Sequence, residues 1–187
     1  MPELTLNPES TARAEYEFWR AHDDKDRPRI EAALERWTGE LYGLEPDVSA
    51  EAVGHLFGAV AAHDTREWDA AVEHAARYYA VIEKHSGLSF DPRQAGELEV
   101  AWWRIHDELE HEADKGPLVD AFSRLYAEVF GVSKDAVRQA CELKAQATVE
   151  HDRAEDPGTP TDQVEVHWAA AARALRKSYD AFRQVAA

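Results

Sequence analysis

Two similar segments of the sequence place a glutamate and a histidine where their side chains could act together. The segments read EYEFWRAHD and EVAWWRIHD, and they begin 84 residues apart. In each segment the glutamate and the histidine are seven residues apart, so a helix places them on one face, two turns from each other. Glu15 with His22, and Glu99 with His106, are therefore the candidate catalytic residues.

Tryptophan side chains accompany both pairs. Trp19 and Trp103 lie between the glutamate and the histidine on the same face, and Trp102 lies beside them. An indole ring removes water from a neighbouring carboxylate, which raises the carboxylate's pKa and makes it a candidate acid or ligand. The three tryptophans are candidate ligand-binding residues through apolar or cation–π contacts. In the competing interpretation the tryptophans are buried for packing alone, and both glutamates are solvated.

If the two segments face each other, two carboxylates and two imidazoles meet at one site. Such a set suits a divalent metal ion held by Glu15, Glu99, His22 and His106, or a coupled acid–base system. Both alternatives stay open from the sequence, and no other cofactor is indicated.

The His-Asp dipeptide that ends both segments occurs four times, at separations of 41, 43 and 45 residues. An acidic residue follows each Asp by three positions, a pattern typical of a helix N-terminus that the Asp caps. In that interpretation the dipeptide joins two helices and does no chemistry. In the other, the fold collects the four histidines and their carboxylates at one end, where they suit metal binding or acid–base catalysis. The four pairs are His22–Asp23, His63–Asp64, His106–Asp107 and His151–Asp152.

The elements that must position these residues are helices. Ala, Glu, Arg and Leu are abundant, no stretch alternates β-branched with polar residues, and only nine Gly and eight Pro punctuate the chain. The prolines and glycines divide the sequence into eight expected helices. These span 10–22, 28–42, 48–63, 65–86, 92–113, 117–130, 133–154 and 162–186.

A repeat of about 44 residues organises the expected helices. Besides the His-Asp pairs, a glycine followed by an aliphatic residue recurs three times at intervals of 44 residues. The unit is a helix ending in His-Asp, a second helix and the glycine turn, which predicts four helical hairpins. Alternate hairpins resemble each other most, at offsets of 84 and 100 residues. We therefore predict a single all-α domain over 1–187, built from two pseudo-symmetric four-helix halves at about 10–88 and 92–187.

Several apolar and aromatic residues are expected in the core. One tyrosine recurs in each second helix, and we expect it to pack in the core with its hydroxyl group reaching solvent. Val60 is expected to be buried, and Cys141 is expected to be a buried thiol. The recurring tyrosines are Tyr42, Tyr79, Tyr126 and Tyr179.

Charge and composition restrict the function. The 187 residues carry a formal net charge of −16, which repels nucleic-acid phosphates and anionic membrane surfaces, so neither is an expected partner. No apolar run approaches the roughly 20 residues of a membrane span, the first residues lack a secretory pattern, and the one cysteine fits a reducing cytoplasm. Glycine-rich phosphate loops, nucleophile elbows, paired Cys-x-x-Cys and His-Glu-x-x-His motifs are absent.

These observations favour a cytoplasmic helical-bundle enzyme or ligand-handling protein that acts on a small organic molecule at a site lined by His, Asp and Glu. The acidic surface favours a neutral or cationic molecule, because an anion would be repelled on approach. The alternative is a non-catalytic helical-repeat module whose groove binds a partner helix or a basic segment. If all four His-Asp pairs face solvent as helix caps, the interaction module is favoured.

Overall fold

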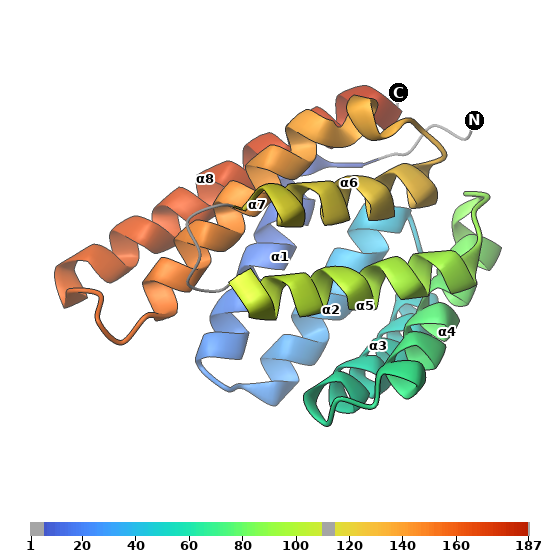
Figure 1. Ribbon diagram of the computed structural model, residues 1–187, viewed down its shortest axis with the longest axis horizontal. Helices are drawn as coiled ribbons and strands as arrows, with labels where there is room; N and C mark the ends of the chain where they lie inside the picture. Colours follow the sequence, from blue (N-terminus) through green and yellow to red (C-terminus); the bar gives the residue numbers. More distant parts are fainter. Residues whose placement is uncertain (1–5, 110–114, 187) are drawn as a thin grey trace.

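The computed structural model describes residues 6–109 and 115–186, and all regular structure in these two ranges is α-helical (Figure 1). The predicted all-α class and the eight helices are confirmed for the described residues. The helices are α1 (Pro8–Asp23), α2 (Arg27–Tyr42), α3 (Pro46–Asp64), α4 (Trp68–Ser86), α5 (Pro92–Leu109), α6 (Gly116–Phe130), α7 (Lys134–Glu155) and α8 (Thr161–Ala186).

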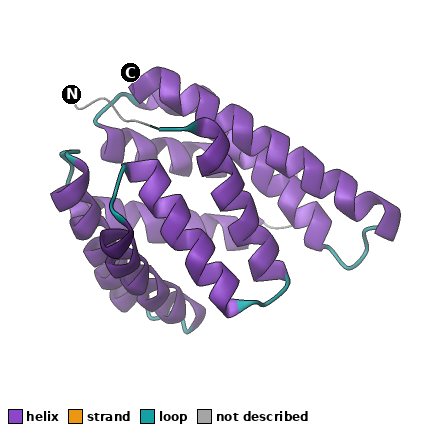
Figure 2. Cartoon of the chain, turned by 180° about the vertical axis from the view of Figure 1, so that it is seen from behind, coloured by secondary structure: helices purple, strands orange, loops and turns teal. Residues whose placement is uncertain are grey.

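The helices form a closed ring. Each one packs mainly against the helices before and after it in the chain, and α8 returns to pack against α1. In Figure 1, α5 and α6 lie in front of α1 and α2, and Figure 2, the view from behind, brings α1 and α2 to the front. One hydrophobic cluster with side chains from all eight helices fills the interior. Residues far apart in the sequence therefore meet in the middle of the ring.

Glycine ends three of the even-numbered helices. Gly43, Gly87 and Gly131 follow α2, α4 and α6 with φ values of 68°, 75° and 65°. Glycine adopts this left-handed conformation at little cost because it has no Cβ. The glycine turns expected from the repeat are thus present.

The four His-Asp pairs lie inside helices, near the C-terminal ends of α1, α3, α5 and α7. The capping role expected for their Asp residues is wrong. Asp26 is the N-cap of α2 and accepts the backbone N–H of Arg29, and Glu67 is the N-cap of α4, without a side-chain capping bond. Lys25 and Arg66 adopt left-handed φ values of 55° and 59° between the pairs and the next helices. These turns separate Asp23 and Asp64 from the helices that they were expected to cap, whereas Asp152 lies inside α7 and Lys115 is the N-cap of α6.

Two further details differ from expectation, and a third falls outside the described residues. Helix α4 begins at Trp68, three residues late, because the turn through Arg66 precedes it. Helix α5 was expected to reach residue 113; its described part ends at Leu109, and residues 110–114 lie outside the described residues. Val60 is 41% exposed and not part of the core.

Candidate functional site

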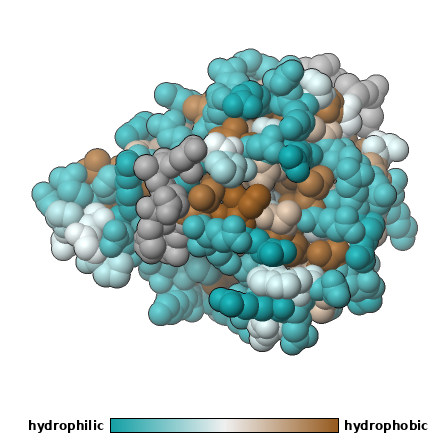
Figure 3. Space-filling model, viewed as in Figure 1, coloured by the Kyte–Doolittle hydropathy of each residue, from teal (hydrophilic) through white to brown (hydrophobic). Residues whose placement is uncertain are grey.

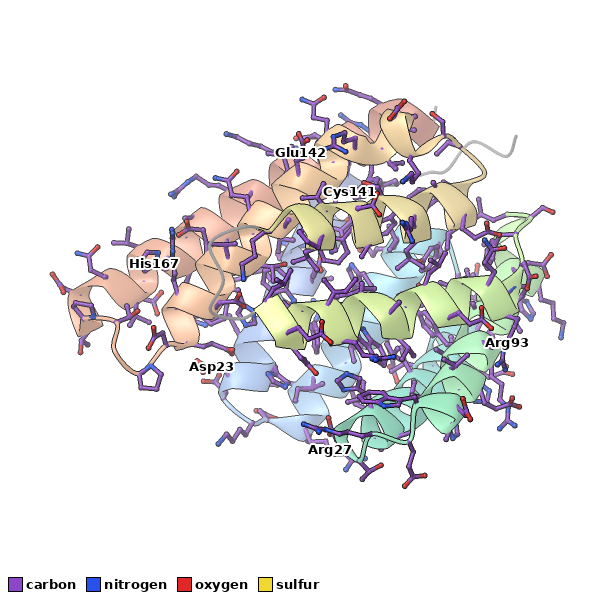
Figure 4. The ribbon with its side chains drawn as sticks, in the orientation of Figure 1. Asp23, Arg27, Arg93, Cys141, Glu142 and His167 are labelled. Carbon is purple, nitrogen blue, oxygen red and sulfur yellow. The ribbon has the colours of Figure 1, made fainter. Side chains whose placement is uncertain are left out.

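A cluster of polar and aromatic side chains occupies the middle of the ring. Its Glu, Lys and Tyr side chains are buried, and its two Trp side chains are half-buried. Side chains from α5 and α6 reach into the space between these helices and those behind them (Figure 4). We call the following nine residues the central cluster: Glu15 of α1, Trp37 and Tyr42 of α2, Tyr79 of α4, Glu99 and Trp103 of α5, Tyr126 of α6, Lys144 of α7 and Tyr179 of α8.

Glu15 is held by a lysine and a tyrosine from the other end of the chain. The ammonium of Lys144 donates to Oε1 of Glu15 at 2.5 Å, and the Tyr179 hydroxyl donates to Oε2 at 2.5 Å. The indole N–H of Trp37 donates to the Tyr179 hydroxyl at 2.7 Å. The side chains of Lys144 and Glu15 are only 6% and 7% exposed, so this is a buried ion pair with hydrogen bonds to both carboxylate oxygens.

Aromatic rings surround the Lys144 ammonium. Its Nζ lies 5.6 to 5.9 Å from the centroids of four rings, within the range of cation–π attraction. These contacts and the Glu15 carboxylate replace much of the hydration that the ammonium loses on burial. The four rings belong to Trp37, Phe122, Tyr126 and Tyr179.

Lys144 is a site residue that the sequence analysis missed, although the sequence contains a signal for it. It follows Val137, Ala140 and Cys141 at the spacing of one helix face, and that face of α7 is buried. Figure 4 shows the two sides of this helix: Cys141 is buried as expected, whereas its neighbour Glu142 is exposed. Burial raises the pKa of the Cys141 thiol to about 12, so the thiol is an unreactive core group.

Glu99 has hydrogen-bond donors but no ion-pair partner among the described residues. The Tyr79 hydroxyl donates to Oε2 at 2.6 Å, and the indole N–H of Trp103 donates to Oε1 at 3.1 Å. Desolvation raises the pKa of Glu99, and the opposing effects of Tyr79, Trp102, Lys144 and Trp103 reduce that rise without cancelling it. Glu99 therefore holds a proton more readily than a solvent-exposed glutamate does.

The recurring tyrosines do not present their hydroxyl groups to solvent, which corrects the expectation from the sequence. All four are buried, and Tyr79 and Tyr179 direct their hydroxyl groups at the two glutamates. Burial, with the nearby carboxylates, raises the pKa of Tyr79 and Tyr179 well above the usual value. These hydroxyl groups consequently stay protonated and act as hydrogen-bond donors.

The structure brings together the two predicted glutamates but not the two predicted histidines. Lys144 donates a hydrogen bond to Glu15, and its positive charge offsets part of the rise in the pKa of Glu99, so both carboxyl groups lie near the same ammonium. His22 is exposed at the end of α1. His106 is 27% exposed and lies 3.3 Å from the carboxylate of Asp152, outside the cluster.

The predicted tryptophans are placed in three environments. Trp103 binds Glu99, and Trp102 packs on Phe122 with ring centroids 5.0 Å apart. Trp19 stacks on His151 at 4.7 Å. Both Trp19 and Trp103 contact a histidine at the end of the ring where the His-Asp pairs lie, since the Trp103 ring is 5.4 Å from that of His63, but Trp103 also binds Glu99 and so belongs to the central cluster.

Where the His-Asp pairs lie, two histidines contact acidic residues, one on a different helix and one on the next turn of the same helix. His63 lies 3.3 Å from Asp107, and His151 lies 3.1 Å from Glu155. Asp23, at the end of α1 in Figure 4, is exposed. Within residues 6–109 and 115–186, no three His, Cys, Asp or Glu side chains are arranged to hold a metal ion. The predicted metal site therefore gains no support from the described residues.

Two surface hollows lie away from the central cluster. One of about 520 Å³ lies between α2 and α3 and is lined by Gly39, Gly43 and Ser49, among others. The other, of about 580 Å³, lies beside α5 and α6, where Leu98 and Ala127 line it. Neither is lined by a residue of the cluster.

We expect Glu99 to make stability depend on pH. Because its folded-state pKa is raised, the native state binds the proton more tightly than the unfolded state does. The contribution of Glu99 to stability is therefore complete below the ordinary glutamate pKa of about 4.3 and is lost as pH rises through the raised pKa. Glu99→Gln should lack this decline, so its stability relative to wild type should increase as pH rises from about 4.

Urea unfolding of both proteins between about pH 4 and pH 8 measures this difference. Glu97→Gln is the matched control, because Glu97 is exposed on the same helix and, in the part of the chain that the structure describes, pairs only with Arg93. Parallel stability curves for wild type and Glu99→Gln would contradict the raised pKa.

None of the helices in the described parts of the chain is long and apolar enough to cross a membrane. No protein-family model, curated protein or solved structure matches the chain.

Proposed function

We propose that the protein binds a small neutral or cationic organic molecule at the central cluster and supplies acid–base chemistry there. The observation that carries this proposal is the burial of Glu15, Glu99 and Lys144 in the middle of a ring of helices. Desolvating such groups costs several kcal/mol each, which an apolar core of similar volume would avoid. Glu99 in addition has a raised pKa, and buried ionisable groups with perturbed pKa values are enriched at functional sites.

Each part of the cluster has a role in this proposal. Glu99 exchanges a proton with the bound molecule, since its raised pKa favours a general acid or base. Tyr79 and Trp103 hold the two oxygens of Glu99 from α4 and α5. Lys144 and Glu15 form a fixed ion pair beside it. A neutral or cationic molecule is favoured because the net charge is −16.

We also propose that the ring is one domain of two four-helix halves related by a pseudo-two-fold axis. Reciprocal hydrogen bonds support this proposal. Tyr179 of the second half donates to Glu15 of the first, and Tyr79 of the first half donates to Glu99 of the second. A two-fold relation requires contacts to be reciprocal in this way. The single cysteine continues to favour a cytoplasmic location.

A binding screen tests the proposed function. Organic amines, alcohols, amides and carboxylic acids are added to the protein, and thermal unfolding and tryptophan emission are measured. Because Trp37 and Trp103 donate hydrogen bonds within the cluster, binding there should change the emission spectrum. We expect at least one neutral or cationic compound to raise the unfolding temperature of wild type and to lose its effect in Glu99→Gln.

The screen also has an outcome that contradicts the proposal. If no compound changes the unfolding temperature or the emission, the cluster is a structural network. The partner-binding alternative would then be favoured, and the hollow beside α5 and α6 would be the surface to examine. The partner-binding alternative was favoured only if all four His-Asp pairs faced solvent. His63, His106 and His151 are instead partly buried and contact carboxylates.

A further inference from the structure

We infer that Glu99 is the receptor for the ammonium group of a small organic amine, which there takes the place that Lys144 takes at Glu15. This inference rests on the proposed function and names the chemical class of the molecule. Its basis is a difference between the two carboxylates of the central cluster: one has a cation supplied by the chain, and the other has none among the described residues.

The Glu15 side of the cluster shows how this interior accommodates an ammonium group. The carboxylate accepts a hydrogen bond from Lys144, a tyrosine hydroxyl fixes the second carboxylate oxygen, and aromatic rings surround the nitrogen. The combination of one carboxylate and several ring faces is the usual recognition device for organic cations. The protein therefore already contains one occupied example of such a site.

The Glu99 side repeats most of these parts. A tyrosine hydroxyl, that of Tyr79, again fixes one carboxylate oxygen, and Trp103 donates to the other. Aromatic rings are again close: Phe90 lies 5.9 Å from the Tyr79 ring, and Trp102 lies 6.2 Å from Trp103. What this side lacks is a cation of its own: within the described residues no Lys, Arg or His side chain forms an ion pair with Glu99, and Lys144, which pairs with Glu15, acts on it only from a longer distance.

Aligning α3 with α7 shows why Glu99 has no lysine partner that corresponds to Lys144. When α3 and α7 are aligned on their His-Asp pairs, buried small residues fall opposite each other, and Lys144 falls opposite Leu56. An apolar leucine, 7% exposed, thus stands in α3 where α7 carries the lysine. The aligned buried pairs are Ala52 with Ala140, Val53 with Cys141, and Ala59 with Ala147.

Half-buried apolar side chains of α5 and α6 suit the apolar part of an amine. Trp102 and Trp103 are half-buried on α5, and Val119 is half-buried on α6. Apolar side chains reach the surface in the middle of the face that these two helices form (Figure 3). A short alkyl chain can lie against this apolar surface while its ammonium group pairs with the buried carboxylate. The net charge of −16 attracts the cation and repels a carboxylate of the same size.

Three probes of similar size and different charge test the inference: n-butylammonium, n-pentanol and pentanoate. Calorimetry and tryptophan emission measure their binding to the full chain near neutral pH. We expect saturable binding of n-butylammonium, with affinity about tenfold or more above that of pentanol and no binding of pentanoate. Glu99→Gln should lose about tenfold or more of the n-butylammonium affinity, whereas Glu97→Gln on the exposed face of α5 should keep it.

A second variant keeps the test decisive if Glu99→Gln folds poorly. Leu56→Lys adds a lysine at the position of α3 that corresponds to Lys144, and it should abolish n-butylammonium binding. If pentanol binds as tightly as n-butylammonium, the ammonium assignment is wrong, although the proposed binding function stands. If none of the probes binds, or if n-butylammonium binds equally to wild type and both variants, Glu99 is not an amine receptor.

Discussion

Replacing Lys144 by methionine is expected to destabilise the protein by about 3–5 kcal/mol. The variant leaves the Glu15 carboxylate buried at 7% exposure, and among the described residues the Tyr179 hydroxyl is then its one hydrogen-bond partner and no cation pairs with it. Methionine fills much of the volume of the lysine chain, so the loss reports the missing charge more than a cavity. Urea unfolding monitored by circular dichroism measures the change in the free energy of unfolding.

Two further variants identify the cause of that loss. Adding Glu15→Gln to Lys144→Met removes the unpaired charge and keeps an acceptor for Tyr179, so much of the stability should return. Lys134→Met, at the exposed start of the same helix, should cost less than about 1 kcal/mol because its pair with Asp120 is solvent-screened. A loss below about 1 kcal/mol for Lys144→Met would contradict a strongly coupled buried pair.

The helices and the two glutamates could be predicted from the sequence because each depends on local patterns. Proline and glycine mark the helix ends, and Gly43 and Gly131 occupy the left-handed positions that only glycine adopts cheaply. Glu15 and Glu99 were recognisable because they recur together with tryptophan at the same spacing. Their burial in one cluster confirms that this recurrence marks an interior position of the fold.

The partners of the glutamates could not be predicted, because they depend on closure of the ring. Lys144 and Tyr179 are 129 and 164 positions from Glu15, and no periodic pattern connects residues across such distances. Lysine is also among the residues least often fully buried, so a lysine within the apolar stripe of α7 is first interpreted as a solvent-exposed residue. The histidines were expected beside the glutamates because they share a helix face with them. Two helical turns beyond Glu15, however, His22 lies at the exposed end of α1 and no longer in the interior.

The close approach of α4 and α5 ties the fold to the site. A Cβ added to Gly96 would lie 2.6 Å from the backbone nitrogen of Ala76 and 2.9 Å from its Cα. Gly96 is buried in α5, three residues before Glu99, whose carboxylate accepts the hydroxyl of Tyr79 on α4. The glycine therefore sets the helix separation that this hydrogen bond requires.

Gly96→Ala is accordingly expected to destabilise the protein by about 1–3 kcal/mol, even though alanine favours a helix by about 1 kcal/mol over glycine. The clashing atoms belong to the backbone of α4 and cannot rotate away, so the two helices must separate. Gly54→Ala is the matched control: nothing lies within 4 Å of its added Cβ, and it should stabilise by about 0.5–1 kcal/mol. Chemical denaturation compares the two variants, and equal stability would show that α4 and α5 do not approach so closely.

Separation of the helices should also weaken the contact between Tyr79 and Glu99, so any compound that binds at Glu99 should bind Gly96→Ala less tightly than Gly54→Ala.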